Sequence, residues 1–121
     1  MGRVRSEELK QRTKQFGLKV MKLVETLPRT KTADVIGRQL LRCATSVGAN
    51  YRAAARARSQ ADFVAKIGVV EEEADESAYW LELLLEAEIG DRAEASKLLK
   101  EADELTAIFT ASGRTARHGL R

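Results

Sequence analysis

Four arginines on one predicted helix have the residue type and spacing that best suit a chemical task. At 100° per residue they lie about 160° to 240° from Ile36, a member of that helix's apolar face. They therefore point away from the core, and they span about 27 Å at 1.5 Å per residue. A guanidinium group holds phosphate through two hydrogen bonds, so such a surface is typical of one that binds RNA or DNA. This arginine stripe consists of Arg38, Arg42, Arg52 and Arg56.

Two lysines of the preceding helix, Lys10 and Lys14, could extend the arginine stripe. No aromatic residue interleaves with the arginines, so stacking of bases on this surface is not expected. Two other interpretations remain open. The arginines could pair with an acidic helix of a neighbouring subunit, or they could form a solvated helix face.

The other candidate chemistries lack essential groups. The acidic run from Glu71 to Glu76 could suggest a metal, but di-iron bundles also use Glu-x-x-His pairs, and the only histidine is His118. Cys43 has no histidine or other activating base nearby in the sequence, so it is a poor nucleophile. No glycine-rich phosphate loop is present. The sequence therefore predicts no metal site and no enzymatic activity.

The charge of the chain is divided between its two halves. Residues 1–58 hold 14 Lys and Arg against 4 Asp and Glu, a net charge of +10. Residues 59–121 hold 7 against 14, a net charge of −7. The net charge of +3 hides this division. A basic half attracts polyanions, whereas an acidic half offers it an internal or intersubunit partner, so the pattern favours binding over catalysis.

The cysteine count and the hydropathy indicate a cellular location. Cys43 is the only cysteine, so no intrachain disulfide framework can form. This favours a reducing cellular compartment. The N-terminal residues contain no apolar stretch typical of a secretory signal. No apolar run approaches the ~20 residues of a membrane span. We therefore expect a cytoplasmic protein without a membrane partner.

The apolar periodicity predicts four helices, over about residues 6–27, 33–57, 60–88 and 92–111. Suitable N-caps precede them at Ser6, Thr32, Ser59 and Asp91. Pro28 is expected to end the first helix, and Gly90 to end the third in the left-handed conformation. Short links between long helices predict an all-α, antiparallel up-down-up-down four-helix bundle over residues 1–111. Residues 112–121 are basic and are predicted to form a disordered tail.

The second predicted helix has a middle of small residues, from Ala44 to Ala49. Gly48 lies inside it, where glycine costs roughly 1 kcal/mol against alanine. Close approach of a neighbouring backbone would compensate for this cost.

The third predicted helix is apolar nearly all round between Tyr79 and Leu85. One antiparallel bundle cannot bury so much of one helix, so we expect an oligomer. The predicted subunit interface combines apolar residues with two carboxylates on the same side of the helix. It comprises Tyr79, Trp80, Leu83, Leu84, Glu72 and Glu76.

The segment from Gln39 to Leu84 carries a series of short motifs in a specific order. They include Ser46-Val47-Gly48-Ala49-Asn50-Tyr51-Arg52, Arg56-Ala57-Arg58-Ser59, Glu71-Glu72-Glu73-Ala74-Asp75-Glu76 and Tyr79-Trp80-Leu81-Glu82-Leu83-Leu84.

With these motifs the chain resembles, over about residues 7–110, the bacterial four-helix-bundle family named after proteins encoded in 23S rRNA intervening sequences. That family is similar to the accessory variability determinant of diversity-generating retroelements. The resemblance implies a ring-shaped homopentamer without enzymatic activity or cofactor. Through the determinant, it also suggests nucleic acid and a reverse transcriptase as partners.

Overall fold

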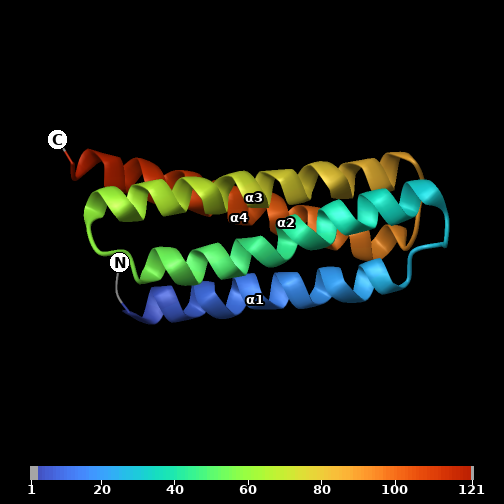
Figure 1. The fold of residues 1–121 in the computed structure, drawn as a ribbon, viewed down its shortest axis with the longest axis horizontal. Coiled ribbons are helices and arrows are strands. Elements are labelled where there is room, and N and C mark those ends of the chain that lie inside the picture. Colours follow the sequence, from blue (N-terminus) through green and yellow to red (C-terminus); the bar gives the residue numbers. More distant parts are fainter. Residues whose placement is uncertain (1–2, 121) are drawn as a thin grey trace.

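The computed structural model describes residues 3–120, which form four long helices. They are α1 (Arg3–Glu25), α2 (Lys31–Ala55), α3 (Gln60–Glu86) and α4 (Arg92–His118). The helices run up and down in turn, and each packs on its two neighbours, with α1 and α4 sharing the thinnest contact. Both termini lie at the end of the bundle that also holds the α2–α3 connection (Figure 1). The predicted all-α, up-down four-helix bundle is confirmed. None of the described helices is long and apolar enough to cross a membrane.

Two of the predicted N-caps are confirmed and two are shifted. Ser59 and Asp91 accept hydrogen bonds from the backbone N–H groups three residues on, at 3.1 and 3.0 Å. The second helix begins earlier than expected, because Thr30 and not Thr32 accepts the bond from the N–H of Ala33. Ser6 lies inside α1, which begins at Arg3.

The end of α3 is built by Glu88 rather than by Gly90. Glu88 has φ 55°, and the N–H of Ile89 donates to the carbonyl of Leu84 at 2.9 Å while that of Glu88 donates to Leu85 at 3.2 Å. This pair of bonds is a Schellman motif, which satisfies the last carbonyls of a helix. Gly90 follows with φ 84°, and a Cβ atom there would lie 2.7 Å from Cδ2 of Leu27. Gly90 therefore shapes the α3–α4 connection and not the helix end itself.

The fourth helix continues through most of the segment that the sequence predicts to be a disordered tail. It ends at His118, and Ser112, Gly113 and Ala116 are buried. Gln60 Nε2 of α3 donates to the carbonyl of Ala116 at 3.0 Å. The three residues are small, and their spacing extends the stripe of Leu105 and Phe109, so α3 can pack closely on this last part of α4.

The helices α1 and α2 approach each other near two glycines. A Cβ atom at Gly48 would lie 3.5 Å from the carbonyl carbon and oxygen of Thr13. One at Gly17 would lie 3.7 Å from the carbonyl oxygen of Ala44 and the Cα of Thr45. The close backbone approach that the sequence predicts at Gly48 is confirmed, and Gly17 is its counterpart on α1.

We predict that Gly90→Ala lowers the free energy of unfolding by about 1–2 kcal/mol, because an L-residue is strained at positive φ. Gly68→Ala is the matched control, since a Cβ atom there meets nothing within 4 Å in the interior of α3. It should raise the free energy of unfolding by up to about 1 kcal/mol. Urea unfolding followed by circular dichroism measures both. Equal shifts of the same sign would contradict the assigned backbone conformation.

We also predict that truncation after Ala111 destabilises the bundle by about 1.5–3 kcal/mol, because it uncovers buried apolar surface on α3. Ile67 loses its cover, since Gly113 packs against it with a Cβ position 3.4 Å from Ile67 Cγ2. Truncation after Gly119 is the control and should leave the thermal midpoint unchanged. A full-length midpoint in the Ala111 truncation would mean that the segment is the dispensable tail that the sequence predicts.

Candidate nucleic-acid interface

A groove of about 550 Å³ runs along the seam between α1 and α2. Its floor includes Gly17 and Gly48, where each helix faces the main chain of the other. Thr45 and Ala49 add only short side chains on the α2 side. The groove is shallow and open to solvent as a result, and a polymer backbone could reach its floor.

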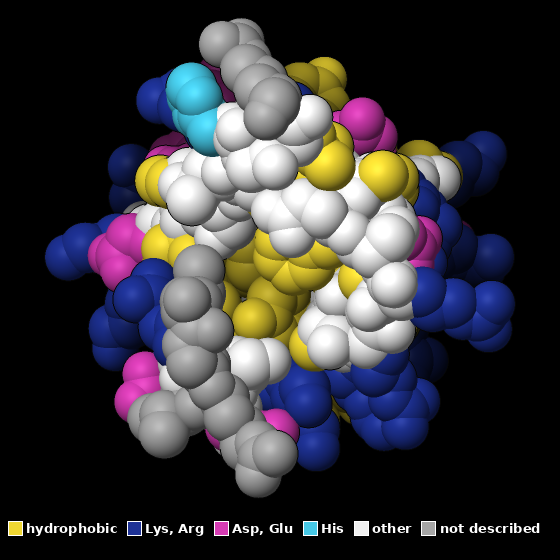
Figure 2. All heavy atoms as spheres, turned by 90° about the vertical axis from the view of Figure 1, so that its left-hand side faces the viewer, with side chains coloured by type: hydrophobic (Ala, Val, Ile, Leu, Met, Phe, Trp, Pro, Cys, Tyr) yellow, Lys and Arg dark blue, Asp and Glu magenta, His cyan; other side chains and the backbone are white. Residues whose placement is uncertain are grey.

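Three of the predicted basic residues meet at this groove: Lys10 and Lys14 from α1 and Arg52 from α2. Since Gly48 faces Thr13 and the helices are antiparallel, Arg52 lies one turn further along, level with Lys10. Lys10 pairs with Glu7 at 3.1 Å. Within the part of the chain that the structure describes, Lys14 and Arg52 form no ion pair. Figure 2 shows Lys and Arg side chains gathered on the lower right of the molecule, where α1 and α2 lie.

The four residues of the arginine stripe do not form one continuous surface. Arg42 leans toward α3, where it pairs with Glu76 and, at 3.5 Å, with Glu73 of the same chain. The hydrogen bond from Arg42 to Glu76 raises the pKa of the Arg42 guanidinium above its ordinary value. Arg38 is largely exposed and pairs with Asp34 one turn before it at 3.1 Å.

Arg56 caps the C-terminal end of α2 and is exposed. It also forms no ion pair with the described acidic residues. The arginines that remain available near the groove are Arg52 and Arg56, and Arg38 lies beyond Arg42 toward the other end of α2.

A basic residue of α1, Arg12, is also paired with acidic residues of the same chain. Arg12 makes two hydrogen bonds of 2.8 Å to Glu101 and one of 2.7 Å to Glu104, both on α4. These hydrogen bonds, chiefly the pair to Glu101, raise the pKa of the Arg12 guanidinium. Sequence reasoning missed this bridge between α1 and α4, although the two carboxylates stand three residues apart on one helix face.

The predicted interface residues of α3 divide into two groups. Leu84 is only 1% exposed and belongs to the core, so its assignment to a subunit interface is wrong. Leu83 is partly buried and packs against the core. Tyr79 is 52% exposed and meets the Trp80 ring edge-on, with 5.1 Å between the ring centroids.

The two carboxylates predicted for the interface also differ from each other. Glu76 accepts a 3.1 Å hydrogen bond from Trp80 Nε1 in addition to its pair with Arg42. Glu72 is exposed on the outer face of α3. Glu76 is therefore satisfied within its own chain, whereas Glu72 and Tyr79 face solvent.

The side chains with nucleophilic or metal-binding potential are separate from the groove. No group of three or more His, Cys, Asp and Glu side chains among the described residues is arranged to hold a metal ion. Cys43 is fully buried and accepts a hydrogen bond from the Ser77 hydroxyl at 3.3 Å. Burial raises the pKa of the Cys43 thiol, which keeps it protonated near neutral pH.

The comparisons with known proteins agree with the fold and with the motifs. A family profile described as "23S rRNA-intervening sequence protein" matches residues 5–111. A crystal structure from Bacteroides thetaiotaomicron, of a protein of unknown function from the S23 ribosomal protein family, superposes with a TM-score of 0.78 at 32% sequence identity. The match covers 85% of this chain and 95% of that one. No curated protein matches this chain. The resemblance seen in the sequence is confirmed, and the chain belongs to the 23S rRNA-intervening sequence protein family.

Proposed function

We propose that this protein is a non-enzymatic, oligomeric nucleic-acid-binding protein that holds a phosphate backbone in the α1–α2 groove. The observation that carries the proposal is the convergence of Lys10, Lys14 and Arg52 on one shallow groove with glycines in its floor. These residues belong to the half of the chain with a net charge of +10. Such a surface attracts RNA or DNA by releasing the counterions that surround the phosphates.

The distribution of acidic partners supports a revised set of phosphate contacts. Arg42 and Arg12 are engaged by carboxylates of α3 and α4, so they compensate charge inside the subunit. Lys14, Arg52 and Arg56 keep their hydrogen-bonding capacity for an external anion. The phosphate-binding set is therefore Lys10, Lys14, Arg52 and Arg56, with Arg38 as an outlying contact on the same face of α2.

The same distribution weakens the alternative function, a protein-assembly module whose charges only pair subunits or a protein partner such as a reverse transcriptase. Glu76, one of the two carboxylates proposed for such pairing, already binds Arg42 and Trp80 of its own chain. Glu72 remains available for a basic partner.

The proposed oligomer uses the outer face of α3. Tyr79 is half exposed there, beside the partly exposed Trp80 and Leu83. Aromatic residues that stay half exposed in a single subunit are typical anchors of protein interfaces. Five is the proposed number of subunits, and it rests on the resemblance stated above.

We predict that replacing Lys14, Arg52 and Arg56 together by alanine weakens RNA binding and lowers the magnitude of the salt slope by about 0.7 per lost contact on single strands. Replacing Lys97, Lys100 and Arg114 on α4 removes the same charge from exposed positions elsewhere and is the matched control. Filter binding at several salt concentrations measures both, and circular dichroism checks helix content. An equal loss in both triple variants would contradict a localised site, and dissociation of the oligomer by the first variant would favour the assembly module.

We predict that Tyr79→Glu dissociates the oligomer without loss of helix content, because the side chain touches solvent in the single subunit. Ala107→Glu places the same charge at an exposed position of α4 and should leave the assembly intact. Sedimentation velocity gives the mass of each variant. A wild-type protein that sediments as a folded 13.4 kDa monomer at micromolar concentration would overturn the oligomer.

A further inference from the structure

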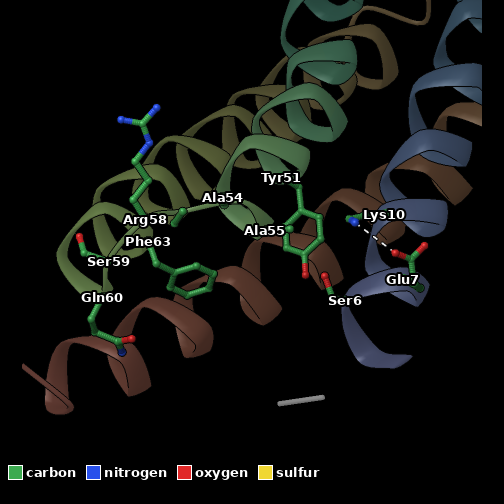
Figure 3. Close-up of a pocket in the computed structure, with 11 residues that line it drawn as sticks. Ser6, Glu7, Lys10, Tyr51, Ala54, Ala55, Arg58, Ser59, Gln60 and Phe63 are labelled. Carbon is green, nitrogen blue, oxygen red and sulfur yellow. Dashed lines mark hydrogen bonds and ion pairs between the residues drawn. The ribbon is translucent and has the colours of Figure 1, made fainter. Parts of the chain in front are cut away.

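A second hollow, of about 620 Å³, lies at the end of the bundle where α1 begins, α2 ends and α3 starts. Figure 2 looks at this end and shows hydrophobic side chains on the floor of a central depression. Figure 3 shows the residues that line it, with Tyr51 and Phe63 on its inner side and Ser6 and Lys10 across from Tyr51. We call this hollow the end pocket.

The Tyr51 hydroxyl is a polar group without a partner in the end pocket. The residue is only 5% exposed, and its ring packs against Phe109 with 5.4 Å between centroids. Its hydroxyl forms no hydrogen bond with the residues that the structure describes, and since none of their buried polar side-chain atoms lacks a partner, the hydroxyl oxygen reaches the solvent of the pocket beside Ser6 (Figure 3). A phenol hydroxyl both donates and accepts. A ligand with a polar edge would therefore find a hydrogen-bonding partner in the Tyr51 hydroxyl, in a pocket that combines polar and apolar lining residues.

Some of the other polar groups of the end pocket are engaged, whereas the side chains of Ser6 and Arg58 also line it and remain available. Ser59 accepts the N–H of Asp62, and Gln60 donates to the carbonyl of Ala116. Lys10 keeps donors beyond its single bond to Glu7. The Phe63 ring is partly buried and offers an aromatic surface toward the pocket. The pocket therefore suits a flat ligand with apolar faces, a polar edge and a negative charge near Lys10.

The end pocket adjoins the α1–α2 groove, because Glu7 and Lys10 line both. A strand whose phosphates lie on Lys14, Arg52 and Lys10 reaches the mouth of the end pocket at Lys10. A nucleobase has the shape and polarity that this pocket suits. Single-stranded ends are the parts of a nucleic acid whose unstacked bases can lie against aromatic side chains and present their edges for hydrogen bonding.

We propose that the end pocket takes the terminal base of a single strand, against Phe63 and within hydrogen-bonding reach of the Tyr51 hydroxyl. This inference rests on the proposed function and deepens it, since it names single strands with a free end as the substrate class. It also differs from the expectation drawn from the sequence, where no aromatic residue interleaves with the arginines. The aromatic residues stand at the end of the basic groove and not along it.

The test compares one short RNA, internally labelled, in linear and in covalently circular form. Tyr51→Phe removes only the hydroxyl and keeps the ring that packs on Phe109. It should weaken binding of the linear strand about threefold to tenfold, the range expected for one hydrogen bond, and leave the salt slope unchanged. Binding of the circle should not change. Ser96→Ala removes an exposed hydroxyl of α4 outside both hollows; it is the control and should affect neither form.

Phe63→Leu provides a second variant that keeps an apolar side chain and removes the aromatic face. It should also weaken the linear strand selectively, because base–aromatic stacking contributes to affinity. If neither Tyr51→Phe nor Phe63→Leu changes binding of the linear strand, the end pocket holds no base. An equal loss for linear and circular strands would overturn the assignment to a terminal base.

The failure of this inference is distinguishable from failure of the proposed function. If the Lys14, Arg52 and Arg56 variant loses affinity for both strands while the Tyr51 and Phe63 variants do not, the groove binds phosphate and the end pocket is unused. If the wild-type protein binds neither strand at low salt, the proposed function fails and this inference falls with it.

Discussion

The backbone contact between α1 and α2 is the constraint on which the surface of this protein depends. At two glycines, Gly17 and Gly48, each helix faces the partner's main chain with space for little more than a Cβ atom. Alanine would fit at either position, because its Cβ atom would lie in ordinary van der Waals contact, whereas a larger side chain would push the helices apart. The glycine in a helix interior costs stability, and the close approach recovers dispersion contacts. The same contact leaves a groove instead of a ridge, and it brings Lys10, Lys14 and Arg52 together.

Neighbouring carboxylates determine which basic residues near that groove form ion pairs within the subunit and which remain available at the surface. Arg12 and Arg42 leave the seam on opposite sides and pair with carboxylates of α4 and α3. The basic pair of helices is thereby joined to the acidic pair within one subunit. Among the described basic residues that form no ion pair, Lys14 and Arg52 lie along the groove and Arg56 lies at the end of α2. A chain with a net charge of only +3 can therefore present a strongly basic face.

The number of helices, their order and two of their caps could be predicted because periodicity and capping are local properties. The direction of the Arg42 side chain, toward α3, could not be predicted. On the helical wheel it lies at about 240° from Ile36 and Arg52 at about 160°, so both point away from the core. The wheel separates their two sides, but the hand of the bundle decides that one side faces α3 and the other α1. That hand depends on the packing of all four helices, and no short segment encodes it.

The helical end of α4 escaped prediction for a different reason. Ser112, Gly113 and Ala116 have the composition of a linker. A prediction follows composition when no large apolar residue identifies the buried face of a helix. Their spacing nevertheless continues that of Leu105 and Phe109. Leu84 was misassigned by the opposite error, since an all-round apolar segment hides which of its residues faces the core. In both cases the size of the side chains gave a wrong prediction of burial, whereas their spacing along the helix indicated which residues are buried.

The exposure of the ion pairs explains why folding and binding should respond differently to salt. The Arg42 side chain is 51% exposed and that of Arg12 is 35% exposed, so solvent and salt screen both pairs. Screened pairs of this kind contribute little to the free energy of folding, which here rests on the buried apolar seams of the helices. Their role is to hold two guanidinium groups away from the groove. Phosphate binding by the remaining cations depends steeply on salt through counterion release. Salt can therefore dissociate a bound strand while the bundle and the geometry of its groove remain intact.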